Sequence, residues 1–460
     1  MKHLDRRQFL TASALAAGGA LMTSRLAFAS ANTSSRFVFI ILRGALDGLT
    51  AAPPYGDPDY ARLRREIAIP SPGAANGAIN LDNLFGLHPN LRFLGDSFAA
   101  RELVVFHAVA SPYRERSHFD GQDVLENGFV RPHASQSGWL NRALAAVPTS
   151  SRKELGVALG QNVPLVMRGP AAVASWSPSK LAALDDDTLE RITDLYARDP
   201  LLSKRLADAL SADAIASEAQ SDGADTDASM APQRASRAAD ASVEPQMSTR
   251  AAEVSMPQTS AGTGESGKVP AGGSSQVLAK REQGKSAARA GYAEVIRAAA
   301  GFLRRDDGPQ IAVFDATGWD THANEGGAQG QLSARLGTLD AGMRTLKEQL
   351  GPTWNNTAVL IATEFGRTAA INGTRGTDHG TGAAAFLLGG AVKGGRVVAD
   401  WPGLSSSALY EGRDLKPTLD MRSIMKGVLA EHLRVPTAAL EKDVFPDSAK
   451  AKVLNGLFRA

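Results

Sequence analysis

Short apolar runs recur along the chain, and many of them are rich in β-branched residues and almost free of charge. Such runs are typical of strands that are covered on both faces of a sheet. The clearest examples are residues 36–42, 102–110, 311–314, 357–363 and 383–388, and a further candidate is residues 163–167. Apolar residues recur at helical spacing in residues 118–126, 186–210, 287–304 and 332–346. This alternation predicts an α/β fold.

One long segment departs from this pattern. Residues 211–286 are rich in Ala, Ser, Gly, Gln and Asp and contain few large apolar side chains. Such a segment cannot bury enough apolar surface to offset the entropy lost on ordering. We therefore predict a disordered insertion here, which divides one domain into residues 30–210 and 287–460.

The amino terminus has the features of an export signal. Arg6 and Arg7 precede an apolar segment that reaches Leu21, and Ala27-Phe28-Ala29 then forms a small-x-small cleavage site. A paired arginine before a mildly hydrophobic core is typical of the bacterial twin-arginine signal. We predict that residues 1–29 are this signal, the alternative being an ordinary secretory signal or an anchor. The apolar core is shorter than a spanning helix needs.

Composition narrows the possible chemistry. The 460 residues include 43% hydrophobic and 21% charged residues, which are globular values. Lys plus Arg (50) nearly balances Asp plus Glu (48) without a basic stripe, so nothing indicates nucleic-acid binding. The chain has no Cys, which excludes disulfides, a thiol nucleophile and a thiolate metal site. Any bound metal would use oxygen and imidazole ligands.

Metal-capable side chains follow several of the predicted strands. In open α/β sheets, ligands bind outside the carboxyl ends of the strands, where such residues meet. A carboxylate and an imidazole that converge there suit a divalent cation, although turn carboxylates and a surface histidine are the ordinary alternative. The candidates are Asp47, Asp320, His322, Glu364, Asp378 and His379.

The segment after the second strand contains a candidate nucleophile. Ser117 precedes the helix predicted from His118, and Asp120 lies at the third helical position, close to a capping box. A hydroxyl at a helix amino terminus is also where a nucleophile or an oxyanion is stabilised. Arg114 and Arg116 are placed to clamp the oxygens of a phosphate or sulfate ester. The alternative is a capping serine with solvated arginines.

Several of these motifs together resemble one family. They are the amino-terminal signal, L-R-G-A-L-D-G-L at 42–49, R-S-H-F-D at 116–120, G-W-D-T-H at 318–322, T-E-F-G-R-T at 363–368 and D-H-G-T-G at 378–382. This set resembles the domain of unknown function 1501 family over nearly the whole chain after the signal, apart from the low-complexity insertion. That family is similar in turn to the alkaline phosphatase and sulfatase superfamily. The resemblance implies a three-layer α/β/α domain with a mostly parallel central sheet and two divalent ions at its carboxyl edge.

The resemblance also implies roles for particular residues. Asp47 looks like the first-strand metal carboxylate, Ser117 like the nucleophile, Asp320 and His322 like ligands of the other ion, Glu364 like the later-strand carboxylate and His379 like the last metal histidine. Many members of the superfamily have an Asp-His pair after the later strand. Here Phe365 follows Glu364, so Asp378 or His118 would have to replace the missing imidazole.

From these features we expect an exported metal-dependent hydrolase of phosphate or sulfate esters with a Ser nucleophile. It would use one or two ions of Zn, Mn, Mg or Ca, and Arg114, Arg116 or Arg367 would neutralise the ester oxygens. The expected partners are a small-molecule or polymer ester and, during export to the periplasm or outside the cell, the twin-arginine translocon. We expect no nucleic acid and no stable membrane span. The alternative is an inactive, metal-stabilised binding or assembly protein of the bacterial envelope.

Overall fold

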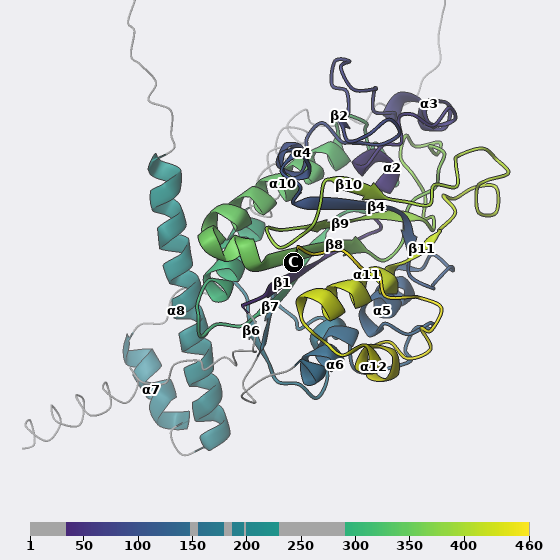
Figure 1. The fold of residues 1–460 in the computed structure, drawn as a ribbon. Helices are drawn as coiled ribbons and strands as arrows, with labels where there is room; N and C mark the ends of the chain where they lie inside the picture. Colours follow the sequence, from purple (N-terminus) through teal and green to yellow (C-terminus); the bar gives the residue numbers. More distant parts are fainter. Residues whose placement is uncertain (1–33, 148–154, 179–185, 197–198, 230–289, 460) are drawn as a thin grey trace, which may run out of the picture.

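The computed structural model describes residues 34–147, 155–178, 186–196, 199–229 and 290–459 (Figure 1). The predicted export signal, residues 1–29, lies outside this part of the chain. Within the described part, every helix falls short of the length and apolarity that crossing a bilayer requires.

A nine-stranded mixed sheet forms the centre of the protein. Its order is β10-β4-β9-β8-β1-β7-β5-β6, and β11 also pairs with β4. All of its pairs are parallel except those that β9 makes with β4 and β8. The strands are β1 (Arg36–Arg43), β4 (Leu103–Ala110), β5 (Gly156–Leu159), β6 (Val173–Trp176), β7 (Ile311–Thr317), β8 (Thr357–Thr363), β9 (Ala383–Leu388), β10 (Arg396–Val398) and β11 (Leu419–Asp420). The prediction of an α/β fold with a mostly parallel central sheet is confirmed.

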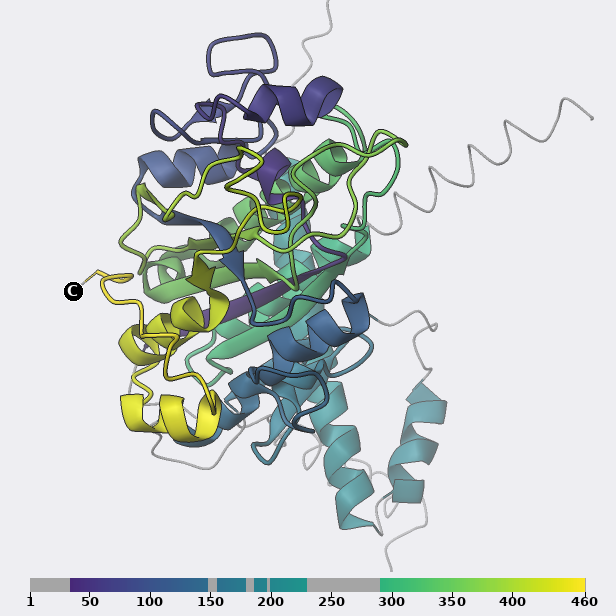
Figure 2. The same cartoon turned by 90° about the vertical axis from the view of Figure 1, so that its right-hand side faces the viewer.

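Helices cover both faces of this sheet (Figures 1 and 2). Successive side chains of a strand point to opposite faces, and in β1 Phe37 and Phe39 belong to one buried apolar cluster while Val38 and Ile40 belong to the other. The cluster of Val38 includes side chains of α4 (Arg92–Ala99), α10 (Gln331–Leu350) and the helix at residues 290–303. The cluster of Phe37 includes side chains of α5 (His118–Asn127), α6 (Trp139–Ala146) and α11 (Met421–Gly427).

Shorter elements complete the described structure. A two-stranded antiparallel sheet is formed by β2 (Ile79–Asn80) and β3 (Gly86–Leu87). The remaining named helices are α2 (Gly48–Ala51), α3 (Tyr60–Arg64), α7 (Asp186–Tyr196), α8 (Pro200–Ser229) and α12 (Thr437–Ala439).

Two sequence predictions need correction. Residues 163–167 do not form a strand, because Leu165–Met167 makes a single 3-10 turn after Pro164 that buries Val166 and Met167. Residues 211–229 are not disordered but belong to α8, where Ala212, Ile215 and Ala216 are buried in the core. The small residues Ala219 of α8 and Gly301 of the helix at residues 290–303 allow the two helices to approach closely. The rest of the predicted insertion, from residue 230 on, lies outside the described residues.

The sheet directs several loops to one edge. Strands β1, β4, β7 and β8 run in the same direction and therefore end at the same edge, whereas the antiparallel β9 begins there. The segments that follow these four strands and the segment that precedes β9 consequently meet. Nearly all candidate chemistry lies in these segments.

Candidate metal centre

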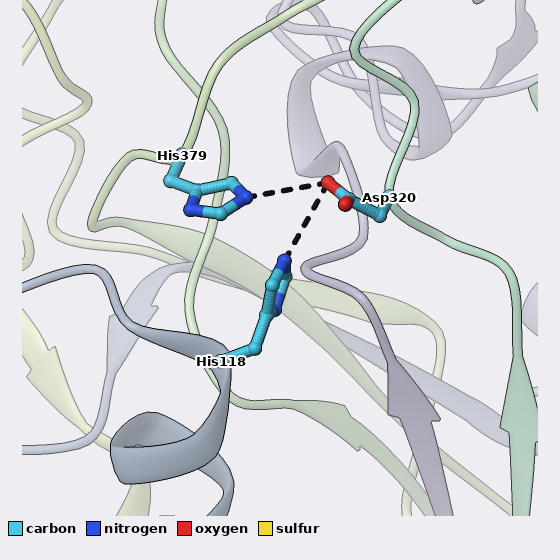
Figure 3. A group of neighbouring side chains, drawn as sticks. All are labelled: His118, Asp320 and His379. Carbon is cyan, nitrogen blue, oxygen red and sulfur yellow. Dashed lines mark hydrogen bonds and ion pairs between the residues drawn. The ribbon is translucent and has the colours of Figure 1, made fainter.

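Two histidines and one aspartate from three distant segments converge at this edge. His118 is the first residue of α5, Asp320 follows β7, and His379 precedes β9. One ligand atom from each lies within 4.8 Å of the others. Figure 3 shows both imidazole rings directed at the carboxylate of Asp320, whose Oδ1 is 3.5 Å from Nε2 of His118 and 3.3 Å from Nε2 of His379.

A third imidazole adjoins this group. Nε2 of His322 lies 3.0 Å from Oδ1 of Asp320 and 2.9 Å from Nε2 of His379. Ligand atoms that bind a tetrahedral zinc ion at about 2.0 to 2.1 Å are separated by about 3.3 to 3.4 Å. The separations around Asp320 are close to this value, so small shifts of these side chains would accommodate an ion.

The three imidazoles share one pattern of hydrogen bonding. Nδ1 of His118 lies 2.8 Å from Oε1 of Glu364, Nδ1 of His379 lies 2.8 Å from the carbonyl oxygen of Arg116, and Nδ1 of His322 lies 3.2 Å from Oδ1 of Asp378. Each Nδ1 has an acceptor, so an imidazole that donates through Nδ1–H presents the lone pair of its Nε2 to an ion. Histidines that bind metals are held in this way. Nε2 of His118 is buried and, within the described residues, lies 3.5 Å from Oδ1 of Asp320 without a closer hydrogen-bond partner, an arrangement that suits a metal ligand.

The charges at the centre favour a bound cation. Burial alone would raise the pKa of Asp320, but the charge of Arg367 and its 2.8 Å hydrogen bond outweigh this effect and lower the pKa. The pKa of His379 is lowered, chiefly by burial, which favours the neutral imidazole that binds metals. The hydrogen bond to Glu364 is the main cause of a raised pKa for His118.

Comparison with known protein families places the chain. A model of the family described as protein of unknown function (DUF1501) matches residues 107–444, which is more than half of the chain. The chain belongs to the DUF1501 family. No curated protein and no solved structure matches it. The matched region contains all three residues of Figure 3 together with His322 and Glu364.

Glu364 of this DUF1501 protein lies behind His118. Its Oε1 accepts hydrogen bonds from the backbone N of Gly44 at 2.8 Å and from Nε2 of Gln122 at 3.1 Å, in addition to Nδ1 of His118. Burial alone would raise its pKa, but these hydrogen bonds, that of His118 foremost, lower it. The structure therefore gives this predicted ligand contacts that orient an imidazole.

The other predicted carboxylates occupy different surroundings. Asp47 is buried at the N-cap of α2, accepts hydrogen bonds from Leu49 N and Thr50 N, and forms an ion pair with Arg64. Asp378 is exposed and accepts hydrogen bonds from His322 and, at 3.0 Å, from Asn372. The hydrogen bond from Asn372 is the main cause of its lowered pKa. The structure brings Asp378 to the centre through His322 and gives Asp47 partners of its own.

Ser117 takes the N-cap position of α5, as predicted, but its side chain makes no cap hydrogen bond. Its backbone N instead donates to the phenol oxygen of Tyr113 at 3.2 Å. Ser117 thus directly precedes the candidate ligand His118, and its hydroxyl does not cap the helix.

The two arginines of the predicted clamp, Arg114 and Arg116, both bind other groups of the protein. Arg114 donates to the carbonyl oxygens of Ser111 and Tyr113. Arg116 forms ion pairs with Glu411 at 2.6 Å and Asp414 at 2.8 Å.

The sequence predicts His118 only as a replacement ligand, and it does not indicate a role for Glu325 or Arg64. The signal for His118 was its place at the start of a helix that follows β4 at the ligand-binding edge. Glu325 and Arg64 carried no comparable signal, because both lie in irregular or short segments whose partners are remote in sequence.

Proposed function

We propose that this DUF1501 protein is an exported metal-dependent hydrolase of phosphate or sulfate esters. The observation that carries the proposal is the set of imidazoles, each fixed at Nδ1, whose Nε2 atoms converge on Oδ1 of Asp320. Nitrogen and carboxylate ligands of this kind suit zinc best and also manganese. An ion bound there would polarise the ester and stabilise developing negative charge.

The residues of the chain would divide the work as follows. His118, Asp320 and His379 hold the ion, and His322 lies close enough to complete the set. Asp320 supplies the negative charge of the ligand set, with Arg367 holding its carboxylate in place. Ser117 is the proposed nucleophile, since it adjoins His118 at the amino terminus of α5, where free N–H groups favour an anion.

The proposal also covers the superfamily of the protein and its export. The carboxyl edge of a mostly parallel sheet is where the alkaline phosphatase and sulfatase superfamily would hold its ions, which supports a relationship with that superfamily. We also propose that residues 1–29 direct twin-arginine export to the periplasm or beyond. A fusion of these residues to a folded reporter tests this, with a second fusion in which Arg6 and Arg7 are both changed to Lys as the control. Equal export of the two fusions would contradict the proposal.

Metal analysis of the folded, exported protein is the first test. We expect about one or two bound ions of Zn, Mn, Mg or Ca per chain and a lower melting temperature in chelator. His118→Ala should lose the ion, whereas His133→Ala, at a histidine whose side chain is 73% exposed, should retain it. Protein that binds no ion and is indifferent to chelator would refute the metal centre.

Turnover is the second test. Ser117→Ala should abolish hydrolysis of an aryl phosphate or aryl sulfate while leaving the circular dichroism spectrum and the metal content unchanged. Ser407→Ala, at an exposed serine, is the matched control. Full activity in Ser117→Ala would mean that another group attacks the ester.

A second function is favoured by one observation. The guanidinium groups of Arg114, Arg116 and Arg367 all donate to protein oxygens, so the predicted clamp is already engaged within the protein. This suits a metal-stabilised binding or assembly protein without turnover. Uniform inactivity of the metal-bound protein towards phosphate monoesters, diesters, phosphonates and sulfate esters would favour this function over hydrolysis.

A further inference from the structure

A buried polar group connects with the metal centre. Asp47, Arg64 and Glu325 are each 0 to 1% exposed. Arg64 forms an ion pair with Asp47 and lies 3.6 Å from Oε1 of Glu325, while the hydroxyl of Thr50 is 3.1 Å from Asp47 and 3.2 Å from Glu325. One guanidinium thus stands between two carboxyl groups. Burial, and then the charge of Asp47, raise the pKa of Glu325 to about 8.

Glu325 joins the two loops that carry most of the ligands. Its Oε2 accepts a hydrogen bond from Oγ1 of Thr321 at 3.1 Å and another from Oγ1 of Thr377 at 2.7 Å. Thr321 lies between Asp320 and His322 in the chain, and Thr377 lies two residues before His379. One carboxyl oxygen therefore binds the segments of three of the four candidate ligands.

Further hydrogen bonds extend this connection to Asp320 itself. Arg367 donates from Nε to Oγ1 of Thr377 at 3.2 Å and from Nη1 to Oδ1 of Asp320 at 2.8 Å. The hydroxyl of Thr377 thus accepts from Arg367 and donates to Glu325, which satisfies both of its roles. A continuous path of hydrogen bonds through the buried residues Arg367 and Thr377 therefore connects Asp320 with Glu325.

We propose that Glu325 is a positioning residue that sets the separation of the two loops and hence of the metal ligands. The proposal rests on the metal centre proposed above. A metal site requires its ligands to be held within about 0.5 Å of the productive geometry. Removal of the Glu325 carboxyl leaves Thr321 and Thr377 without their shared acceptor, so the loops lose this restraint.

Two substitutions separate positioning from the charge of Glu325. Glu325→Gln retains an acceptor oxygen for the two threonines but carries no charge. Glu325→Ala removes the acceptor altogether. If Glu325 acts by positioning the two loops, glutamine retains the metal affinity. If Glu325 acts through its charge, glutamine does not.

The experiment titrates Co²⁺ into the full chain and records both its affinity and its visible absorption spectrum. We expect Glu325→Ala to weaken Co²⁺ binding by about tenfold or more, the range seen for groups that orient ligands, and to alter the spectrum. Glu325→Gln should stay within about threefold of the wild type, well below that range. The double variant Thr321→Val with Thr377→Val should behave like Glu325→Ala. Thr357→Val, at a buried threonine at the start of β8, should change neither property.

The outcomes separate the proposals. Wild-type affinity and spectrum in Glu325→Ala overturn the positioning role while leaving the metal centre intact. If that variant does not fold, the threonine double variant decides in the same way. A wild type that binds no Co²⁺ refutes the metal centre and the positioning role together. Wild-type protein that binds Co²⁺ and loses it in Glu325→Ala, yet hydrolyses no ester, supports the positioning role and refutes only the hydrolase.

Discussion

Replacing Glu364 with glutamine tests whether the hydrogen bond from Nδ1 of His118 to Glu364 strengthens metal binding. The glutamine amide oxygen can take the place of Oε1 and keep the hydrogen bonds from His118, Gln122 and Gly44. The shape and this acceptor are thus retained, the negative charge is lost, and an NH₂ group replaces Oε2 beside the hydroxyl of Thr363. We expect a folded protein with weaker metal affinity, because the imidazole becomes less basic and the ion loses a nearby charge.

The structure sets the scale of this effect. Oε1 of Glu364 is 2.8 Å from Nδ1 of His118, so an ion on Nε2 would lie about 7 Å from the carboxylate. At an effective dielectric constant of about 20, a double charge and a single charge at that distance attract by about 5 kcal/mol. This is an upper bound, because ionic screening weakens the attraction and the amide dipole replaces part of it. Loss of a group that orients a ligand costs about 10- to 100-fold in metal affinity, or about 1.4 to 2.8 kcal/mol, and this is the effect we expect.

A competition titration against a chromophoric zinc chelator measures this change directly. Glu126→Gln is the matched control. Glu126 is a buried carboxylate on α5, the helix that begins with His118, and it pairs with Arg43 and accepts a hydrogen bond from Val166 N. Its substitution should lower stability without a comparable loss of zinc affinity. Equal zinc affinities for Glu364→Gln and the wild type would refute the inference that Glu364 supports a metal-binding His118.

Three further predictions test the centre, the loops and the pH dependence. Asp320→Asn should lower the metal-to-protein ratio, because it removes the charged ligand; unchanged occupancy would show that Asp320 does not bind the ion. Gly376→Ala should lower both the melting temperature and the metal affinity, because the new Cβ would lie 2.4 Å from the carbonyl group of His322. Gly373→Ala, which meets no atom within 4 Å, is its control, and equal behaviour of the two variants would contradict the tight contact. Burial lowers the pKa of His432 from 6.5 to about 4, so the unfolded chain takes up the proton first as the pH falls. The stability from neutral His432 is complete above pH 6.5 and should decrease by about 2 kcal/mol at pH 5. Urea unfolding at pH 7 and pH 5 should show a smaller decrease for His432→Asn, and an equal decrease would refute this assignment.

Much of the architecture could be predicted because burial leaves a strong mark on the sequence. Residues 357–363 and 383–388 were predicted as strands with the bounds that the structure has, since runs covered on both faces are almost purely apolar. The weakest predictions concerned segments whose apolar residues are few or small. Residues 163–167 bury Val166 and Met167 through a helical turn, and residues 211–229 bury alanines that resemble a low-complexity segment.

The residue types at the carboxyl edge follow from the order of residues alone, because the strand pattern and the absence of Cys can both be read from it. This order predicts a site of oxygen and imidazole ligands that includes Asp320 and His379. Which side chains meet there depends on the folded chain. Strand order and loop packing bring Asp47 to Arg64. They also bring Glu364 to His118, although these two residues are 246 positions apart in the chain. A pattern of apolar positions specifies which face of a strand is buried, but it carries no information about which remote loop lies beside its end.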